Sequence, residues 1–295
     1  SCDETAAAVV EEGSRLLSNV VASSMDLHIP YGGVVPEIAA RSHIEGILPV
    51  IQQALDEADC VWDDIDGIAV TYGAGLGGSL LIGVLTARTL AIAHDKPLYA
   101  INHVEAHVYA NFLTNTSLPG YSLRKSSPEF PMLAIIVSGG HSQLVLFQNH
   151  FDYVLLGQTH DDAIGEAFDK VAKMLGLPYP GGPSVSKAAL DGNPLAFKLP
   201  QAKLDKSDFS LSGLKTAVLR LAQSEIGERH DFPSTGLPER LSEAQKANIA
   251  ASFQRTAIET IVDKAKLAIQ EYDPRSVVIA GGVAANQELR RQLSQ

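Results

Sequence analysis

The sequence predicts an α/β fold. Three short runs rich in β-branched residues each end in a glycine-rich turn, and each turn leads into a helix or a returning strand. Between these runs, apolar residues recur at the three- and four-residue spacing of helices. Alternating strands and helices are typical of α/β domains. The 295 residues, 45% of them hydrophobic and 19% charged, are enough for two globular domains.

The N-terminal half holds two predicted helices and one strand. A helix is expected over 36–58, with Pro36 in its first turn and a kink at Pro49. A strand over 68–71 enters a glycine-rich turn, and a helix follows to about residue 93, with Ser79 as its N-cap. We expect the apolar stripe of the first helix to face the core; it comprises Ile38, Ile44, Ile47, Leu48, Ile51 and Leu55.

The C-terminal half predicts a hairpin, two core helices and a last strand. Residues 132–137 and 143–147 flank a Ser-Gly-Gly-His turn, which is typical of a hairpin. Residues 276–280 form a strand that enters a Gly-Gly turn before a helix from about residue 287. The predicted core faces of the helices over 162–175 and 242–272 are Ile164, Phe168, Val171 and Leu175, and Ile249, Phe253, Ala257, Ile261 and Leu267.

A segment rich in Ser, Pro, Gly and charge over 115–131 predicts a linker. We therefore expect one lobe over 1–114 and a second over 132–295. The chain begins without Met and stops at a young helix, so we interpret it as a fragment truncated at both ends.

Charge and cysteine content exclude some classes of protein. The formal net charge of −11 argues against a broad cationic surface for nucleic acid, although it leaves room for a local basic strip. No run of 18 apolar residues is present, so we expect no membrane span. Cys2 and Cys60 lack metal-type or disulfide-framework spacing, which suits a reducing, cytoplasmic compartment.

Three Gly-Gly turns at strand ends are candidate phosphate cradles, because glycine lets backbone N–H groups approach an anion closely. The alternative for each turn is a tight bend in a compact fold. His103 and His107 are four residues apart, so on a helix both imidazoles can bind one metal ion. Glu105 does not lie beside His103, as the base of a zinc protease would require, and a further metal ligand must come from elsewhere.

Two further segments carry polar groups. Asp161 and Asp162 are explained by capping of the helix that follows them, whereas Asp169 lies two turns in and is a candidate for ribose hydroxyls. Residues 209–216 join hydroxyls, a glycine and Lys215, either as a ligand site or as an ordinary helix start.

Together these segments resemble the TsaD family, the tRNA N6-adenosine threonylcarbamoyltransferases, formerly called O-sialoglycoprotein endopeptidases. The matching stretches follow the family's order along nearly the whole chain. They are residues 1–5, 32–37, 103–107, 137–141, 165–170, 179–183, 209–216 and 281–286.

The resemblance implies a two-lobed actin-like, sugar-kinase or Hsp70-type ATPase fold with a central cleft. It implies transfer of the threonylcarbamoyl group from threonylcarbamoyl-AMP to N6 of the adenosine beside the anticodon, in tRNAs reading codons that begin with A. It also implies TsaB and TsaE as partner proteins. A metalloprotease and a small-molecule kinase of the same fold are the alternatives.

Site residues follow from the resemblance position by position. His103 and His107 match the metal ligands, with iron(II) the usual ion and zinc compatible with the same ligands. The third ligand is expected beyond Gln295, and the first strand of the lobe before Ser1, so we expect weak metal binding and no activity from the fragment. The matching substrate-binding residues are Ile136, Val137, Ser138, Gly139, Gly140, Asp169, Gly182 and Asn286.

Overall fold

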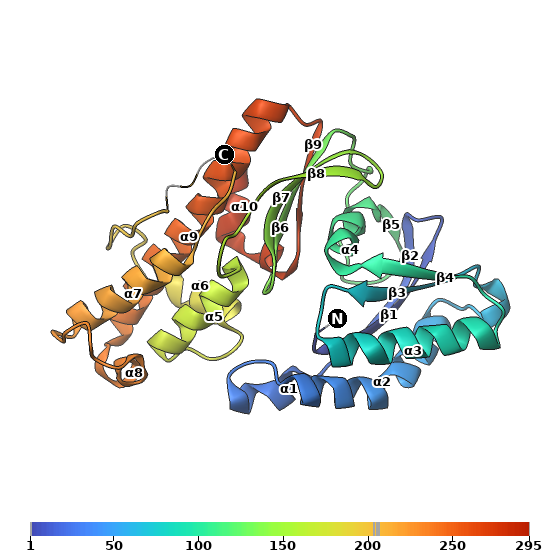
Figure 1. Cartoon of the computed structure of the whole chain (residues 1–295), viewed down its shortest axis with the longest axis horizontal. Helices are drawn as coiled ribbons and strands as arrows, with labels where there is room; N and C mark the ends of the chain where they lie inside the picture. The colour runs from blue at the N-terminus through green and yellow to red at the C-terminus, as the bar shows by residue number, and fades with distance from the viewer. Residues whose placement is uncertain (1, 203, 205–206, 295) are drawn as a thin grey trace. The chain divides into compact units, whose positions relative to one another are not determined.

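The chain divides into two compact units, Ser1–Ser127 and Pro128–Gln295. A computed structural model describes residues 2–202, 204 and 207–294 (Figure 1). The division between Ser127 and Pro128 lies within the segment 115–131. That segment is not wholly a loop, because β5 (Asn115–Thr116) pairs with a strand of the first unit.

The first unit contains two small sheets. In one, β1 (Glu4–Glu11) and β2 (Arg15–Ser23) are antiparallel, and β2 pairs in parallel with β5. In the other, β3 (Ile68–Gly73) pairs in parallel with β4 (Leu98–Asn102), which confirms the predicted strand over 68–71. A cavity of about 910 Å³ lies between β1 and β3 and is also lined by residues of two helices.

Those two helices are α2 (Pro36–Glu57) and α3 (Gly77–Ala93). Pro36 occupies the first turn of α2, as predicted. Ser79 does not cap α3, because the helix begins two residues earlier; its hydroxyl instead donates to the Cys2 carbonyl oxygen at 2.7 Å. The shorter helices of this unit are α1 (Met25–His28), η1 (Ile29–Tyr31), η2 (Trp62–Asp64), α4 (His103–Tyr109) and η3 (Ala110–Phe112).

The predicted core face of α2 is wrong at two of its six positions. Ile44 and Leu48 are 60% and 61% exposed, whereas Ile38, Ile47 and Ile51 are half-buried and Leu55 is buried. The buried residues of α2 are Ala39, His43, Val50, Ala54 and Leu55. Small side chains let the helix lie close to the sheet, and His43 is accommodated because its ring bonds Thr5 Oγ1 at 2.7 Å. Among the large aliphatic side chains of α2, Ile44 and Leu48 face solvent.

The second unit is built on one four-stranded sheet in the order β8-β7-β6-β9. The predicted hairpin is confirmed, since β6 (Met132–Val137) and β7 (Ser142–Asn149) pair antiparallel. β8 (Asp152–Gln158) extends it, and β9 (Ser276–Ala280) pairs in parallel with β6. Because β6 and β9 are parallel, the turns that follow them emerge at the same edge of the sheet.

Helices pack on this sheet, as Figure 1 shows for the longest of them, α9 (Glu243–Tyr272). α9 begins with a capping box formed by Ser242 and Gln245. α5 (Ile164–Leu175) ends at Gly176, which adopts the left-handed conformation at φ 69°. The remaining helices are α6 (Gly181–Ala189), α7 (Ser212–Glu225), η4 (Ser234–Gly236), α8 (Leu237–Arg240), η5 (Gly282–Ala285) and α10 (Gln287–Leu293).

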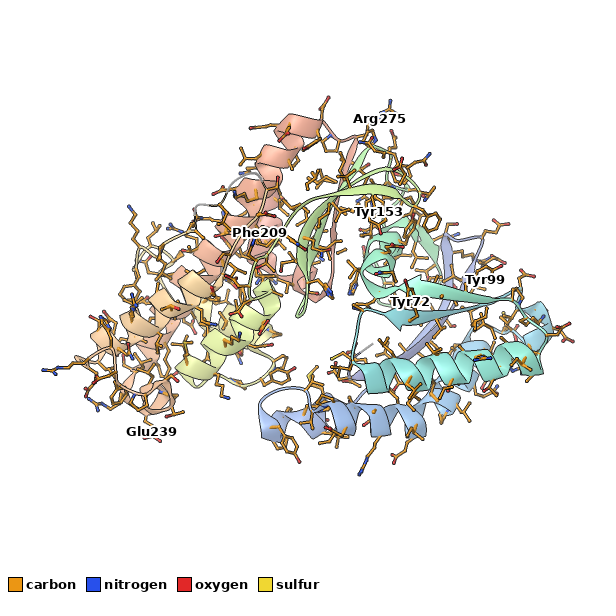
Figure 2. All side chains as sticks on the ribbon, in the orientation of Figure 1. Tyr72, Tyr99, Tyr153, Phe209, Glu239 and Arg275 are labelled. Carbon is orange, nitrogen blue, oxygen red and sulfur yellow. The ribbon has the colours of Figure 1, made fainter. Side chains whose placement is uncertain are left out.

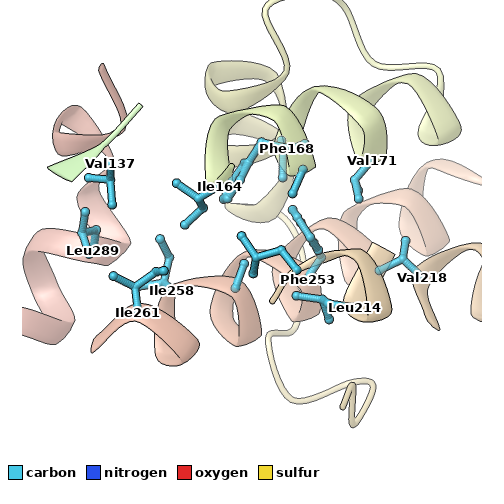
Figure 3. Close-up of a cluster of buried hydrophobic side chains, with 14 of the residues drawn as sticks. Val137, Ile164, Phe168, Val171, Leu214, Val218, Phe253, Ile258, Ile261 and Leu289 are labelled. Atoms are coloured by element: carbon cyan, nitrogen blue, oxygen red, sulfur yellow. The ribbon is translucent and has the colours of Figure 1, made fainter. Parts of the chain in front are cut away.

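The core of the second unit lies between one face of β6 and the helices (Figure 3). Ile164, Phe168 and Val171 of α5 are buried there, as predicted, and the Phe168 and Phe253 rings meet edge to face at 5.0 Å. Phe209, labelled in Figure 2, is also buried in this core. The prediction that Leu267 belongs to this core is wrong: Leu267 is 52% exposed, and Ala265 and Ala268 are the buried residues of that turn.

Among the described residues, no helix has both the length and the apolar character that a membrane span requires.

Candidate functional site

The paired histidines lie on α4, which follows directly from β4. Asn102 ends the strand and caps the helix, because its Oδ1 accepts hydrogen bonds from the backbone N–H groups of Val104 and Glu105. This cap fixes where the helix begins. His103 and His107 are therefore one turn apart on the same face, as their spacing predicts.

The two imidazoles converge. Nε2 of His103 lies 3.1 Å from Nε2 of His107, and the ring centroids are 4.4 Å apart. Two nitrogens bound to one ion at about 2.0–2.1 Å are separated by about 3.0–3.4 Å. The pair therefore fits a shared metal ion. Among the described residues, no cluster of three or more His, Cys, Asp or Glu side chains completes the site, so the third ligand stays a prediction.

In the second unit, the turn after β6 is held by its own hydrogen bonds. Ser138 N–H donates to the His141 carbonyl oxygen at 2.8 Å, and His141 N–H donates to Ser138 Oγ at 3.0 Å. A Cβ on Gly139 or Gly140 would meet nothing within 4 Å. The outer side of this turn is thus open, and its glycines leave the backbone accessible to a ligand.

Two other glycines pack against the inner side of this turn. A Cβ on Gly165, in the first turn of α5, would lie 2.7 Å from Gly139 Cα. A Cβ on Gly281, after β9, would lie 2.4 Å from the Val137 carbonyl oxygen, and Gly281 has φ 94°. Only glycine fits at either position. The ends of β6 and β9 and the start of α5 therefore form one close-packed glycine cluster.

Ile136 and Val137 contribute to this cluster through the backbone alone. Their side chains are buried in the sheet, at 1% and 0% exposure. Any ligand contact made by these two residues must therefore use main-chain atoms.

Asp169 joins α5 to α6. Its Oδ1 accepts a hydrogen bond from Gly181 N–H at 2.7 Å. Burial raises the pKa of Asp169, more than the bond from Gly181 lowers it. A Cβ on Gly181 would lie 2.4 Å from Asp169 Cα, whereas one on Gly182 would meet nothing within 4 Å. Gly181 is thus required for packing, and Gly182 presents an open surface.

Asn286 caps α10, because its Oδ1 accepts a hydrogen bond from Leu289 N–H at 3.0 Å. Its Nδ2 lies 3.1 Å from Ser186 Oγ on α6 and 3.1 Å from Gln254 Oε1 on α9. The Ser186 hydroxyl also reaches the Gly182 carbonyl oxygen at 2.9 Å. Gly182 and Asn286, distant in the sequence, are therefore joined through one serine.

Asp161 and Asp162 do not cap the helix that follows them. α5 begins at Ile164 without a side-chain cap. Asp161 instead caps α7: its carboxylate accepts hydrogen bonds from the backbone N–H groups of Leu211 and Ser212 and from the hydroxyls of Ser210 and Ser212. Burial alone would raise the pKa of Asp161, but these bonds outweigh it and lower the pKa to about 2.

Asp162 binds Lys215, the lysine of the segment 209–216. It forms ion pairs with Lys170 and with Lys215, the latter at 2.8 Å. These pairs outweigh burial and lower the pKa of Asp162. The hydroxyls and the lysine of 209–216 thus bind the two aspartates, which favours the structural interpretation of that segment over a ligand site.

The structure brings most of the predicted substrate-binding residues into one unit. Ser138 and Gly139 contact Gly165 at the start of α5, Asp169 of α5 holds Gly181, and Gly182 connects through Ser186 to Asn286. His103 and His107 belong to the first unit. The sequence reasoning missed Ser186 and Gln254. The signal available for Ser186 was its position one helical turn after Gly182.

The chain is similar to known proteins over nearly its whole length. The model of the TsaD family, described as tRNA N6-adenosine threonylcarbamoyltransferase, matches residues 15–295. A relative from Thermomicrobium roseum with that same name is 50% identical, over 100% of this chain and 82% of its own length. Another, from Moorella thermoacetica, is 48% identical over 99% of this chain and 80% of its own length.

A solved structure supports the fold alone. Full-length HypF, in a phosphate- and nucleotide-bound form, superposes with a TM-score of 0.54 at 14% identity. The superposition covers 94% of this chain and 47% of HypF. The predicted α/β class is confirmed, and the superposition shows that the chain shares a fold with HypF.

Proposed function

Because this chain belongs to the TsaD family of tRNA N6-adenosine threonylcarbamoyltransferases, we propose that its donor substrate is threonylcarbamoyl-AMP. The family name fixes the reaction class, an acyl-type transfer to adenosine N6 in tRNA. The proposed acceptor is the adenosine beside the anticodon in tRNAs that read codons beginning with A.

The glycine cluster carries the proposal for the donor site. Gly165 and Gly281 leave no room for a side chain beneath the Ser138–Gly140 turn, while Gly139, Gly140 and Gly182 face open space. Backbone N–H groups presented in this way suit the phosphate of an adenylate. Asp169, which bonds Gly181 of α6, and Asn286, which bonds Ser186 of α6, are then the proposed contacts to the nucleoside.

His103 and His107 are the proposed metal ligands, with iron(II) or zinc as the ion. When bound, the ion supplies Lewis-acid chemistry, either polarising the carbamoyl oxygen or holding substrate oxygens. The support from this chain is the convergence of the two Nε2 atoms.

The proposed reaction forms a bond between adenosine N6 and the carbamoyl carbon and breaks the bond from that carbon to the phosphate oxygen, releasing AMP. This chain's part is to bind the donor and to stabilise charge on the departing phosphate. The backbone N–H groups of Gly139 and Gly140 donate hydrogen bonds to that phosphate. The close-packed glycines keep the turn rigid, so little reorganisation is needed during transfer.

The proposed partners are TsaB and TsaE proteins, in a cytoplasmic location. The exposed aliphatic side chains of α2 and α3 support a protein partner on the first unit, because patches of this kind mark interaction surfaces. We name this surface the α2–α3 face and assign it to TsaB. It consists of Ile44, Leu48, Leu81, Leu85 and Ile92.

The test incubates the full-length protein, with TsaB, TsaE and ATP, with threonylcarbamoyl-AMP labelled in its threonine and with unmodified tRNA. Label in the tRNA and stoichiometric AMP support the proposal. The same mixture is incubated with a sialylated glycoprotein. Cleavage of that glycoprotein without labelling of tRNA would favour the metalloprotease alternative instead.

A further inference from the structure

The side-chain amide of Asn286 forms hydrogen bonds with residues of three different helices, α6, α9 and α10. Nδ2 carries two protons, and two acceptors lie within reach, Ser186 Oγ and Gln254 Oε1, each at 3.1 Å. Oδ1 accepts from Leu289 N–H at 3.0 Å. This pattern fixes the orientation of the amide, because turning it over would place Nδ2 against the Leu289 N–H donor.

Gln254 and Ser186 are themselves linked. Ser186 Oγ lies 2.8 Å from Gln254 Oε1 and 2.9 Å from the Gly182 carbonyl oxygen, so its single proton points to one of the two. Gln254 Oε1 accepts from the asparagine amide and also lies within hydrogen-bond distance of the serine hydroxyl. Among the described residues, Ser186 Oγ is the only other acceptor for Asn286 Nδ2, so loss of the Gln254 oxygen leaves one of the two Nδ2 protons without its partner.

We propose that Gln254 is a positioning residue that orients Asn286 so that only the second lone pair of Asn286 Oδ1 is available to the substrate. This inference rests on the proposed function, in which Asn286 contacts the nucleoside of the adenylate. It follows that the substrate group meeting Asn286 is a hydrogen-bond donor. In an adenylate the donors are the ribose hydroxyls and the 6-amino group of adenine.

The first experiment compares Gln254→Leu, Gln254→Glu and Gln270→Leu in the full-length protein. Gln270 is an exposed glutamine on the same helix and provides the matched control. The measurements are the dissociation constant for AMP, the KM for threonylcarbamoyl-AMP, kcat and the melting temperature.

We expect Gln254→Leu to weaken AMP binding and raise KM about tenfold with little change in kcat, since it removes one acceptor that orients the amide. Gln254→Glu keeps an acceptor oxygen and should restore both constants to within about twofold of the parent. A loss of melting temperature alone, with AMP binding and KM like those of Gln270→Leu, would overturn the proposal. So would a Gln254→Glu variant as impaired as Gln254→Leu.

The second experiment identifies the donor. Asn286→Ala is measured with AMP, with the 2′-deoxy and 3′-deoxy analogues and with purine riboside monophosphate, which lacks the 6-amino group. The variant should weaken AMP binding about tenfold and leave one analogue unaffected, namely the one that lacks the group bonded to Oδ1. Equal weakening of all four ligands would contradict the assignment of Oδ1 as acceptor.

These outcomes distinguish a failure of the role proposed for Gln254 from a failure of the proposed function. A parent protein that neither binds AMP nor labels tRNA overturns both. A parent protein that does both, with Asn286→Ala impaired and Gln254→Leu unimpaired, overturns the role of Gln254 alone.

Discussion

At the scale of single residues, the histidine pair gives the clearest prediction. We expect His103→Ala with His107→Ala to lower bound metal, measured by elemental analysis of the purified full-length protein, at least about tenfold. Transfer to tRNA should fall with it. The matched control is His230→Ala, an exposed histidine in the second unit. Unchanged metal content and activity in the double variant would contradict the assignment.

Gly181 and Gly182 form a matched pair of adjacent positions. Gly181→Ala places a Cβ 2.4 Å from Asp169 Cα, and we expect it to destabilise the protein by about 1–3 kcal/mol. Gly182→Ala meets open space and should leave stability nearly unchanged, while it narrows the proposed donor site and raises the KM for threonylcarbamoyl-AMP. Urea unfolding and steady-state kinetics on both variants test this. Equal unfolding free energies would contradict the packing argument.

Individual residues differ in how far the sequence predicts them. The His103–His107 spacing alone places both rings on one face, because helical periodicity is local. The capping roles predicted for Asp161 and Asp162 are wrong, since Asp161 binds backbone groups about 50 residues away in the chain and Asp162 pairs with Lys170 and with the equally distant Lys215. Nothing in the local sequence distinguishes a cap for the next helix from a cap for a later one.

At the scale of elements, Asp161 controls the start of α7. We expect Asp161→Ala to lower the free energy of unfolding by about 1 kcal/mol at pH 7, as for loss of an N-cap. The folded pKa of about 2 lies below the usual value, so the stabilisation is complete above about pH 4 and disappears as pH falls through about 2. The gap between parent and variant should therefore narrow in acid.

Urea unfolding at a series of pH values measures that gap. Asp191→Ala is the control, because this exposed aspartate has no side-chain hydrogen bond among the described residues. A gap that stays constant or widens toward acid pH would count against the capping role.

The α2–α3 face gives a second prediction at this scale. Ile44→Glu with Leu48→Glu should leave the fold intact, because both side chains are exposed, and should abolish co-purification with TsaB. Ala39 lies on the buried side of the same helix, so Ala39→Glu should instead unfold the first unit. Undiminished binding of TsaB to the folded double variant would remove this face as the docking surface.

Element prediction was strongest where one face of a helix is strongly apolar. In α5 the four predicted core residues are all buried, because the other side of the helix carries its charged residues, none of which is buried. In α2 apolar residues occur on several faces, and the predicted stripe wrongly included Ile44 and Leu48, which are exposed. The spacing of apolar residues predicts that a helix has an apolar face, but where several faces carry apolar residues it does not predict which of them meets the sheet.

At the scale of the whole molecule, the α/β class and the family followed from the order of strands, glycine turns and helices. The glycine cluster did not, because it depends on β6 and β9 being adjacent and parallel, a pairing of residues more than 130 positions apart. The sequence identified each Gly-Gly turn but not which turns touch. Gly165, in the first turn of α5, supplies the contact that brings them together.

The most direct test of the central claim is mass spectrometry of nucleosides from tRNA incubated with the full-length protein, TsaB, TsaE and threonylcarbamoyl-AMP. We predict N6-threonylcarbamoyladenosine at the position beside the anticodon, and none when that adenosine is replaced by guanosine. The His103→Ala with His107→Ala variant should give little or none. Unmodified tRNA after incubation with the parent protein, or equal modification by the double variant, would contradict this account.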